Sequence, residues 1–508
     1  MPYVKTALLS AFKKQDLENH ASKLLELGVK IWASGGTAKY LSEKGLEVNS
    51  IEKLTGFDQL LNGRVKTLHP AVFAGILARD TEQDEKSLKE AGYPKFDLVY
   101  VNLYPFIENA FEIEDENELV ELIDIGGIAL LRAAAKNFKR TVVATDYDDL
   151  KQIIETLEKE NYIPEEMSRN LAVKTFFMTS YYDSIIAKRF WDGTHFPKYM
   201  SLAGTNENMP ELRYGENPHQ HAALYMTHPA EGIPKAEVLW GKSLSFNNFV
   251  DLDSALMAVL DFKEPACVIV KHNSPCGIAV GKRLIDAYEG ALASDPLSAF
   301  GGIVALNRKV DEETAELMRK HFFECIVAPE YDEQAFETLK KRKNLRILRL
   351  PEFVRKWRYN AKIISGGVLV QNDDPEEELI GAWQVVTDTK PTETQRKDLI
   401  FAMKAAKFVK SNSVVIAKNG ATVGIGGGLP SRVDAAILAV RKAGDRANGA
   451  VAASDAFLPF PDTLYVLAQA GVKALIQPGG SRNDKLSIEA ANKLGVAMVF
   501  TGRRHFRH

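Results

Sequence analysis

Cysteine is scarce in this chain of 508 residues, and long apolar runs are missing. Only Cys267, Cys276 and Cys325 occur. An odd and sparse set argues against a disulfide framework and fits a reducing compartment, so we expect a cytoplasmic protein. No apolar run approaches the ~18 residues that span a bilayer. The segment from Met1 to Lys5 lacks the charged and then apolar pattern of a signal peptide, so we expect no membrane association.

An excess of charge of one sign is also missing. The 64 lysines and arginines oppose 67 acidic residues, for a formal net charge of -3. This balance gives no electrostatic argument for a nucleic-acid or membrane-surface partner. The hydrophobic content of 45% is ordinary for a globular protein. At this length, about three domain-sized units are expected.

Short apolar runs alternate with helical patterns over the first 150 residues. Strands are predicted at residues 6–9, 29–33, 97–105 and 141–145, and helices at 17–27, 38–44 and 128–136. This alternation favours a parallel, doubly wound α/β sheet with helices on both faces. A charged helical stretch over 148–191, followed by an irregular polar stretch, predicts a domain boundary near residue 200.

Two polar clusters in this half suit an acidic ligand. Ser34 to Thr37 lie between a predicted strand and a predicted helix, which presents backbone N–H groups to an anion. A tight turn with an ordinary helix cap is an equally good interpretation. The segment from Gly63 to Pro70 carries Arg64 and Lys66, and scattered surface charge is the usual explanation for such a pair.

The most informative stretch runs from residue 266 to residue 277. An apolar run of strand length ends in Lys271 and His272, and Pro275 and Gly277 then predict a turn. In α/β proteins, side chains just past the carboxyl end of a strand face the ligand crevice. A Lys-His pair there can supply a general base and a cation that stabilises an oxyanion. The alternative is a polar loop that caps a buried strand.

Two short internal matches suggest that the second half is duplicated. Residues 271–274 resemble residues 410–413, and residues 294–300 resemble residues 454–457. Chance is the alternative, because both matches are short. If the duplication is real, a site between the halves is expected.

Two apparent motifs fail on inspection. Residues 424–428 begin like a dinucleotide-binding loop, but Leu429 occupies the position of the third glycine. Those glycines instead allow the backbone to approach a flat ligand or a neighbouring strand closely. Pro275-Cys276 begins like the signature of zinc deaminases, but Ala279 replaces the second cysteine and no His-x-Glu lies upstream in this half. We therefore expect no metal.

From end to end, the chain resembles the bifunctional purine biosynthesis family, which joins an AICAR transformylase to an IMP cyclohydrolase. The segments that carry the resemblance are Ser34 to Thr37, Gly63 to Pro70, Asn102 to Phe106, Asp124 to Asn137, Leu212 to Gln220, Lys271-His272, Ser294 to Gly302, Ser454 to Phe460 and Arg504 to Phe506. The resemblance implies a doubly wound, methylglyoxal-synthase-like cyclohydrolase domain over residues 1–197. It also implies a transformylase domain over residues 198–508, made of two cytidine-deaminase-like repeats without zinc. Family members are homodimers whose transformylase sites use both subunits.

For the second domain, the resemblance implies formyl transfer from 10-formyltetrahydrofolate to the 5-amino group of AICAR. The folate is a co-substrate, and no tightly bound cofactor is expected. The amine is a weak nucleophile, because its lone pair is delocalised into the imidazole ring and the carboxamide. His272 matches the family's base, and Lys271 matches the cation that stabilises the oxyanion. The family's substrate-binding positions fall on Arg213, Tyr214, Asn248, Gly301, Glu324, Asn412, Arg432, Phe457, Asp462, Arg504 and Phe506.

For the first domain, the resemblance implies dehydrative ring closure of the formylated product, FAICAR, to IMP. Lys136 matches the proton donor and acceptor, a role that a nearby second lysine would favour. Lys66, Tyr104 and Asp124 match the residues that polarise the carbonyl and position the amide. The substrate-binding positions fall on Ser10, Lys14, Ser34, Gly35, Gly36, Thr37, Arg64, Thr67, Asn102 and Ile125.

The chain departs from the family pattern at a few positions. Phe12 and Lys13 replace a serine and an aspartate, Leu429 replaces a glutamine, and Met178 replaces a usual histidine. Phe12 cannot make the hydrogen bond of the lost hydroxyl. Two alternatives therefore stay open: a transformylase with a weakened cyclohydrolase, and a nucleotide-binding regulatory protein without turnover. The intact matched lysines and His272 argue against the second alternative.

Overall fold

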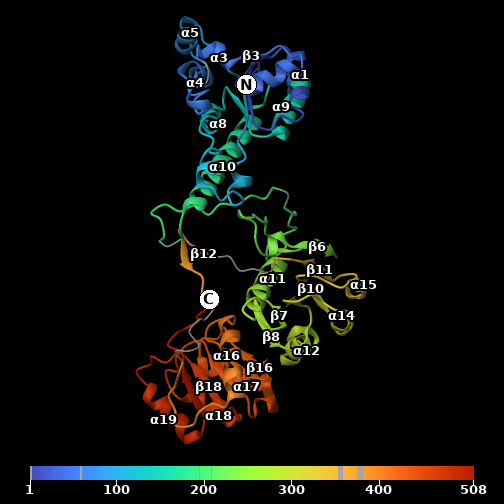
Figure 1. The fold of residues 1–508 in the computed structure, drawn as a ribbon, viewed down its shortest axis with the longest axis vertical. Coiled ribbons are helices and arrows are strands. Elements are labelled where there is room, and N and C mark those ends of the chain that lie inside the picture. Colours follow the sequence, from blue (N-terminus) through green and yellow to red (C-terminus); the bar gives the residue numbers. More distant parts are fainter. Residues whose placement is uncertain (1–2, 58–59, 194, 208, 353–358, 375–382) are drawn as a thin grey trace. The chain divides into compact units, whose positions relative to one another are not determined.

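The computed structural model describes residues 3–57, 60–193, 195–207, 209–352, 359–374 and 383–508. The chain forms two compact units (Figure 1). The N-terminal unit comprises Met1–Thr205 with Thr227–Pro229, and the C-terminal unit comprises Asn206–Met226 with Ala230–His508. No helix in the described part of the chain combines the length and apolar character needed to cross a membrane. The three cysteines are free and buried.

The N-terminal unit is built on a parallel sheet with the strand order β3-β2-β1-β4-β5 over the described residues. The order reverses between β1 and β4, and right-handed crossovers then place helices on both faces of the sheet. The expected doubly wound fold is thus confirmed. The strands are β1 (Thr6–Ala11), β2 (Lys30–Ala33), β3 (Asn49–Ser50), β4 (Leu98–Asn102) and β5 (Val142–Ala144). The helices are α1 (Leu17–Glu26), α2 (Gly35–Glu43), α3 (Ile51–Thr55), α4 (Pro70–Leu77), α5 (Glu82–Ala91), α6 (Phe106–Asn109), α7 (Glu116–Val120), α8 (Gly126–Lys136), α9 (Tyr147–Glu160) and α10 (Glu165–Phe190).

The predicted elements of this unit are observed close to their predicted bounds. The strand β4 ends at Asn102 instead of residue 105, and the helix α2 starts at Gly35 instead of Ala38. Its first turn includes the two glycines that predicted a turn, because Ser34 already adopts the extended conformation of an N-cap. The apolar residues that predicted the first strand, such as Leu8 and Leu9, are fully buried in the core.

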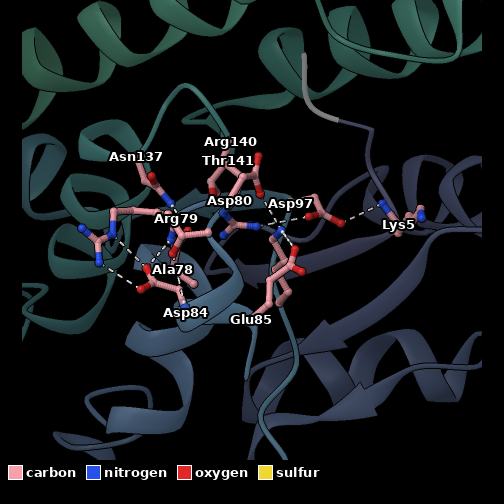
Figure 2. Close-up of polar contacts among 12 residues, drawn as sticks. Lys5, Ala78, Arg79, Asp80, Asp84, Glu85, Asp97, Asn137, Arg140 and Thr141 are labelled. Carbon is pink, nitrogen blue, oxygen red and sulfur yellow. Dashed lines mark hydrogen bonds and ion pairs between the residues drawn. The ribbon is translucent and has the colours of Figure 1, made fainter. Parts of the chain in front are cut away.

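A buried guanidinium fixes the end of α8 to the sheet (Figure 2). Arg140 donates to the backbone carbonyls of Gly75, Ile76 and Phe96 at 2.8–3.0 Å, and to the Asp97 carboxylate at 3.2 Å. The second Asp97 oxygen accepts from two backbone N–H groups at the start of β1, at 2.9 and 3.0 Å. Burial raises the pKa of Asp97, and these donors oppose that shift. The network fixes the positions of α4, α8 and β1 relative to one another.

The C-terminal unit contains a continuous sheet of 12 strands within the described residues, in the order β14-β19-β18-β17-β15-β16-β8-β7-β9-β10-β11-β6. Its first repeat consists of β6 (Glu237–Trp240), α11 (Phe246–Val259), β7 (Ala266–Lys271), β8 (Ser274–Val280), α12 (Leu284–Ser294), α13 (Pro296–Ala299), β9 (Gly302–Leu306), α14 (Glu312–Met318), β10 (Phe323–Ala328), α15 (Glu333–Lys340) and β11 (Arg346–Arg349). Its second repeat consists of β14 (Gln384–Val385), α16 (Glu393–Lys407), β15 (Val414–Lys418), β16 (Ala421–Gly426), α17 (Arg432–Ala443), β17 (Val451–Ser454), α18 (Asp462–Gln469), β18 (Ala474–Gln477), α19 (Asp484–Leu494) and β19 (Ala497–Phe500). A separate hairpin pairs β12 (Tyr359–Ile364) with β13 (Gly367–Asn372).

The two repeats follow the same strand order and the same parallel and antiparallel pattern, so the expected duplication is confirmed. The two short matches that suggested it were wrong in register. Residues 271–274 connect β7 to β8, whereas residues 410–413 precede β15, the counterpart of β7. Residues 294–300 precede β9, whereas residues 454–457 begin at the last residue of β17, the counterpart of β9. The duplication is therefore real, but the two short sequence matches that suggested it join positions that are not equivalent in the two repeats.

Glycines bring one helix of each repeat close to the sheet. A Cβ at Gly277 in β8 would lie 1.9 Å from the carbonyl oxygen of Ala291 in α12. A Cβ at Gly424 in β16 would lie 2.1 Å from the carbonyl oxygen of Ala439 in α17. The glycine-rich stretch after residue 424 thus serves close backbone packing, as expected, although the neighbour is a helix and not a strand.

Gly277→Ala therefore should destabilise the C-terminal unit. The added methyl group overpacks a backbone–backbone contact, which costs about 1–3 kcal/mol of unfolding free energy. Gly367→Ala is the matched control, because the nearest atom to its Cβ is 3.8 Å away. Denaturant unfolding of both variants is the measurement. Equal stability of the two variants would contradict the packing role of Gly277.

Candidate active sites

The carboxyl ends of β1, β2 and β4 meet at the point where the strand order of the N-terminal unit reverses, which is where open α/β sheets bind ligands. The side-chain oxygen of Asn102, at the end of β4, accepts from the backbone N–H groups of Phe12 and Lys13, at 2.9 Å each. The hydroxyls of Ser10 and Ser34 lie 2.8 Å apart. The structure thus brings together predicted site residues from three neighbouring strands.

The turn that opens α2 is held from both sides. The Thr37 hydroxyl accepts from the backbone N–H of Ala11 and donates to its carbonyl. The Gly35 N–H donates to the Glu52 carboxylate at 3.0 Å. Gly36 is exposed, and a Cβ there would lie 3.9 Å from Cε of Lys14, so the lysine side chain passes beside the turn. The Lys14 cation suits an anionic group, whereas the Gly35 N–H is already engaged by the Glu52 carboxylate.

Asp124, Lys66 and Tyr104 are brought together at the start of α8. The Asp124 carboxylate accepts from the N–H of Gly127 at 2.6 Å. Burial raises the pKa of Asp124, while hydrogen bonds from the backbone of Gly127 and Tyr104 and the charge of Lys66 oppose the shift. The Thr67 hydroxyl lies against the same helix start, 2.9 Å from where a Cβ at Gly126 would be. The Asp124 carboxylate, the charge of Lys66 and the backbone of Tyr104 therefore meet at one end of α8.

Other matched residues of this unit lie apart from that group. Lys136 is the exposed last residue of the 11-residue helix α8, about 15 Å along its axis from Gly126. The Arg64 guanidinium forms an ion pair with Glu121, and its Nε lies 3.2 Å from the carboxylate. Ile125 is 60% exposed. The structure thus does not place Lys136 next to a second catalytic lysine.

The two departures at the end of β1 have identifiable contacts. The Phe12 ring meets the Tyr104 ring edge to face, with centroids 5.3 Å apart and an interplanar angle of 86°. The Lys13 ammonium pairs with Glu108 at 2.8 Å on the surface. Phe12 therefore replaces a hydroxyl with an aromatic contact to a predicted catalytic residue.

In the C-terminal unit, Lys271 to Asn273 form the tight turn of the β7–β8 hairpin. His272 and Asn273 have φ angles of 53° and 57°, the left-handed values that such turns require. The Asp251 carboxylate, on α11, accepts from both of their backbone N–H groups, at 3.2 and 2.6 Å. The strand β7 is antiparallel to both of its neighbours, and the Lys-His pair lies at its carboxyl end, as expected.

The turn between β7 and β8 lies at His272 and Asn273, before the two residues that predicted it. Pro275 and Gly277, which predicted it, lie inside β8. The ammonium of Lys271 donates to the carbonyl oxygen of Phe300 at 2.7 Å. The His272 side chain is exposed. The hairpin therefore presents the imidazole outward from a backbone that is fixed on both sides.

Other matched residues surround this hairpin. The Asn248 amide donates to Glu324 at 3.1 Å, and Arg346 lies 3.7 Å from the same carboxylate. Gly301 directly follows Phe300, and its N–H donates to the carbonyl of Phe322 at 2.8 Å. The segment from residue 212 to residue 220 approaches α11, where the Asn247 amide donates to the Glu216 carbonyl at 3.3 Å.

A second cluster lies in the second repeat around Arg432, which is 8% exposed. Its guanidinium pairs with Asp455, donates to the Ser454 hydroxyl at 2.9 Å, and donates to the Asn412 side chain at 2.8 Å. Asp455 is fully buried. Arg432 is therefore held rigidly by a buried carboxylate and two neutral groups, with Asn412 beside it.

The aromatic and charged residues of the chain end join this second cluster. The backbone N–H of His505 donates to the Asp455 carbonyl at 2.9 Å. The Arg504 guanidinium lies 4.4 Å from the centroid of the Phe506 ring. Phe457 is 40% exposed, and Asp462 is exposed at the start of α18. Arg213 makes a similar contact with its neighbour Tyr214, at 5.7 Å.

Both clusters lie at the same edge of the 12-stranded sheet. The repeats join through antiparallel pairing of β8 with β16, in which Ala279 lies opposite Ala421. This register places the start of β8, beside the His272 turn, level with Gly426 at the end of β16. Asn412 precedes β15, which pairs with that end. The His272 turn, which connects β8 to β7, is therefore separated from Asn412 by two to three strand spacings, about 9–14 Å.

The turn of the second repeat that is equivalent to the His272 turn lies at the opposite edge of the sheet and has no histidine. In the second repeat, Asp398 holds the equivalent turn through the N–H groups of Asn419 and Gly420. Lys418 donates to the Asn448 carbonyl at 2.8 Å, just as Lys271 donates to Phe300. Asn419 stands where the first repeat has His272. The lysine contact therefore belongs to the repeat, and the imidazole to the first repeat alone.

The counterparts of the buried ion pair are also uncharged. Leu284 begins α12 as Arg432 begins α17. Asn307 follows β9 as Asp455 follows β17, and its amide bonds to the backbone of Ala266, Phe262 and Glu264. Of the two equivalent sets of positions described by the structure, one therefore combines an imidazole with a buried guanidinium, and the other has Asn419 and Leu284 in their places.

Sequence reasoning missed two residues that hold these groups in place. Asp251 fixes the His272 turn, and Asp455 fixes Arg432. Asp251 could have been identified from the sequence, because Asp251 and Asp398 occupy the same position in the first helix of each repeat. Asp455 lay inside a segment that resembled the family, but nothing in the sequence indicated its buried arginine partner.

Among the described residues, no group of three or more histidine, cysteine or acidic side chains could hold a metal ion. The clusters are instead composed of amides, carboxylates, cations and aromatic rings. Such groups suit recognition of anionic and flat ligands and proton transfer.

The chain matches two family models. One, described as the AICARFT/IMPCHase bienzyme, matches residues 134–442, and the other, described as an MGS-like domain, matches residues 16–129. The chain belongs to the AICARFT/IMPCHase bienzyme family. The resemblance seen in the sequence is thereby confirmed, and the bienzyme combines AICAR transformylase and IMP cyclohydrolase activities in purine biosynthesis.

Curated relatives of this bienzyme align along its whole length. A bifunctional purine biosynthesis protein, PurH, of Petrotoga mobilis is 47% identical, covering 99% of this chain and 100% of the relative. Proteins of the same name from Thermoanaerobacter sp. and Aquifex aeolicus are 48% and 47% identical, with the same coverage.

Asp251→Asn should slow formyl transfer by the bienzyme about 10-fold, since an amide cannot accept both N–H groups of the His272 turn and a misplaced base loses rate steeply. Asp398→Asn is the matched control, because it perturbs the equivalent turn that lacks the histidine. Release of tetrahydrofolate is the measurement. A similar loss in both variants would contradict a specific role for the His272 turn.

Proposed function

We propose that the two activities are divided along the chain, with cyclohydrolase in residues 1–197 and transformylase in residues 198–508. The observation that carries this division is the separation of the matched groups. Lys66, Tyr104 and Asp124 lie in the compact N-terminal unit, whereas Lys271 and His272 lie in the C-terminal unit.

In formyl transfer, the AICAR amine attacks the formyl carbon of 10-formyltetrahydrofolate and loses a proton as the N–C bond forms. His272 is the base that takes this proton. Two observations support this role: the imidazole is exposed, and the Asp251 carboxylate fixes the backbone of its turn. Histidine readily accepts a proton near neutral pH.

Lys271 stabilises the negative charge that develops on the formyl oxygen. Its ammonium group has three donors, and the Phe300 carbonyl engages one of them in the structure. The remaining donors are available to an oxyanion beside His272. On the same sheet edge, Arg432 and Asn412 contribute to nucleotide recognition, together with the aromatic rings of Phe457 and Phe506.

In ring closure, the carboxamide nitrogen of FAICAR attacks the formyl carbon, and water is lost. Asp124 accepts from the amide and positions it, while Lys66 and Tyr104 polarise the carbonyl. The shared position of these groups at the start of α8 supports this assignment. Lys136 lies at the opposite end of α8 from Asp124, so within this chain it does not share a site with Lys66 and Asp124 for proton transfer.

The nucleotide is held by the turns of the N-terminal unit, from Ser10 and Lys14 to Ser34, Gly35, Gly36 and Thr37, with Arg64, Thr67, Asn102 and Ile125. In the C-terminal unit, the remaining contacts come from Arg213, Tyr214, Asn248, Gly301, Glu324, Asp462 and Arg504. The small-molecule partners are AICAR, FAICAR and 10-formyltetrahydrofolate, and no tightly bound cofactor is required.

The active form is a homodimer in the cytoplasm. Apolar side chains on two surfaces support self-association, because exposed patches of this kind mark interfaces. Phe177 on α10 is 75% exposed, and Ile363 and Leu369 in the β12–β13 hairpin are 83% and 57% exposed. An isolated two-stranded hairpin is marginally stable in water, so a partner surface would stabilise it. The free, buried cysteines support a reducing location.

An assay with two signals tests the division of activities. Tetrahydrofolate release reports formyl transfer, and IMP formation reports ring closure. We expect His272→Ala to abolish the first signal while leaving closure of supplied FAICAR intact, and Lys66→Met to do the reverse. Loss of both activities in either variant would contradict the division. Binding of AICAR without either signal would favour the regulatory alternative.

Phe12→Ser tests whether the departure at the end of β1 weakens the cyclohydrolase. We expect ring closure to slow by a factor of about 2–10, because the edge contact that orients Tyr104 is lost. Tyr3→Ser is the control, since that exposed ring makes a comparable contact with Tyr162 at 6.5 Å. Faster closure in Phe12→Ser would instead favour the alternative of a weakened cyclohydrolase.

A further inference from the structure

Tyr182 on α10 holds the turn that carries Asp124. Its hydroxyl accepts from the backbone N–H of Asp124 at 2.8 Å and donates to the carbonyl of Leu122 at 3.4 Å. The side chain is 1% exposed. Burial raises the pKa of Tyr182 to about 12, so the hydroxyl remains a donor at physiological pH. One hydroxyl thus bridges two backbone groups that the turn itself leaves without partners.

The Tyr182 ring also supports the segment that carries Tyr104. It packs edge to face on Phe106, with centroids 6.0 Å apart and an interplanar angle of 61°. The N–H of Phe106 donates to the Tyr104 carbonyl at 2.8 Å. Phe106 and Tyr182 belong to one small buried apolar cluster with Ala110, Leu119 and Ile185. A single side chain of α10 therefore contacts the supports of both Asp124 and Tyr104.

The Asp124 turn borders open space that is lined by residues of α8 and α10. A cleft of about 380 Å³ is lined by Asp124, Ile125, Arg132, Tyr182 and Asp183, among others. Without the Tyr182 hydroxyl, the Asp124 N–H would have to turn toward that cleft to find an acceptor in water.

We propose that Tyr182 is a positioning residue for ring closure, acting through the backbone of Asp124. The inference rests on the proposed cyclohydrolase role of Asp124. In this role, Tyr182 acts through Asp124 and not on the substrate itself. Its hydroxyl sets where the carboxylate lies relative to Lys66 and Tyr104, and a displacement of about 1 Å at such a site is enough to lower a rate strongly.

Tyr182→Phe in the full chain is the test, because it removes only the hydroxyl. We expect kcat for closure of FAICAR to fall about 10-fold, with KM changed less than twofold and formyl transfer unchanged. Tyr331→Phe is the matched control. That tyrosine is also buried and donates to a backbone carbonyl, of Leu348 at 2.8 Å, but it lies in the C-terminal unit. A kcat within twofold of the parent would overturn the inference.

A double-mutant cycle with Asp124→Asn separates positioning from general destabilisation. If Tyr182 acts through Asp124, then adding Tyr182→Phe to Asp124→Asn causes no further loss of kcat. A full additional loss would overturn the inference.

The same cycle distinguishes this inference from the proposed function. Unimpaired ring closure in Asp124→Asn would contradict the catalytic assignment of Asp124 and the positioning role together. Impaired closure in Asp124→Asn, combined with normal closure in Tyr182→Phe, would overturn only the role of Tyr182.

Discussion

The C-terminal unit depends on one strand pair, β8 with β16. The Val280 N–H donates to the Gly420 carbonyl at 2.8 Å, and the Thr422 hydroxyl bonds to both the N–H and the carbonyl of Ile278. This pairing joins two repeats into one sheet and fixes their relative direction. The antiparallel direction brings the His272 turn of one repeat and the Arg432 cluster of the other to the same edge. With any other register, the two clusters would lie at different heights along the sheet.

The N-terminal unit reaches a comparable result by a different route. Its parallel strands all present their carboxyl ends at one edge, and the reversal of strand order between β1 and β4 opens that edge to a ligand. The buried Arg140 network lies toward the end of α4, away from this edge, and keeps the sheet and helices in register. The buried network and the predicted site therefore lie at opposite ends of the strands.

Local pattern was enough to predict the doubly wound unit, because each strand there is followed by its own helix and turn. It was not enough for the β7–β8 hairpin, since Pro275 and Gly277 looked like turn residues while His272 and Asn273 made the turn. Partners distant in sequence were the least predictable. The contacts of Asp251, Asp455 and Tyr182 depend on which helix lies beside which turn, and only the packed fold determines that.

The matched turns of the two repeats differ in one residue that matters for chemistry. His272 and Asn419 share a left-handed backbone, a lysine before them and an aspartate that holds them. Asparagine and histidine are both among the few non-glycine residues that tolerate this conformation. Their codons differ by a single base. Once the gene had been duplicated, one nucleotide substitution was therefore sufficient to place or remove an imidazole at this turn without rebuilding the protein around it.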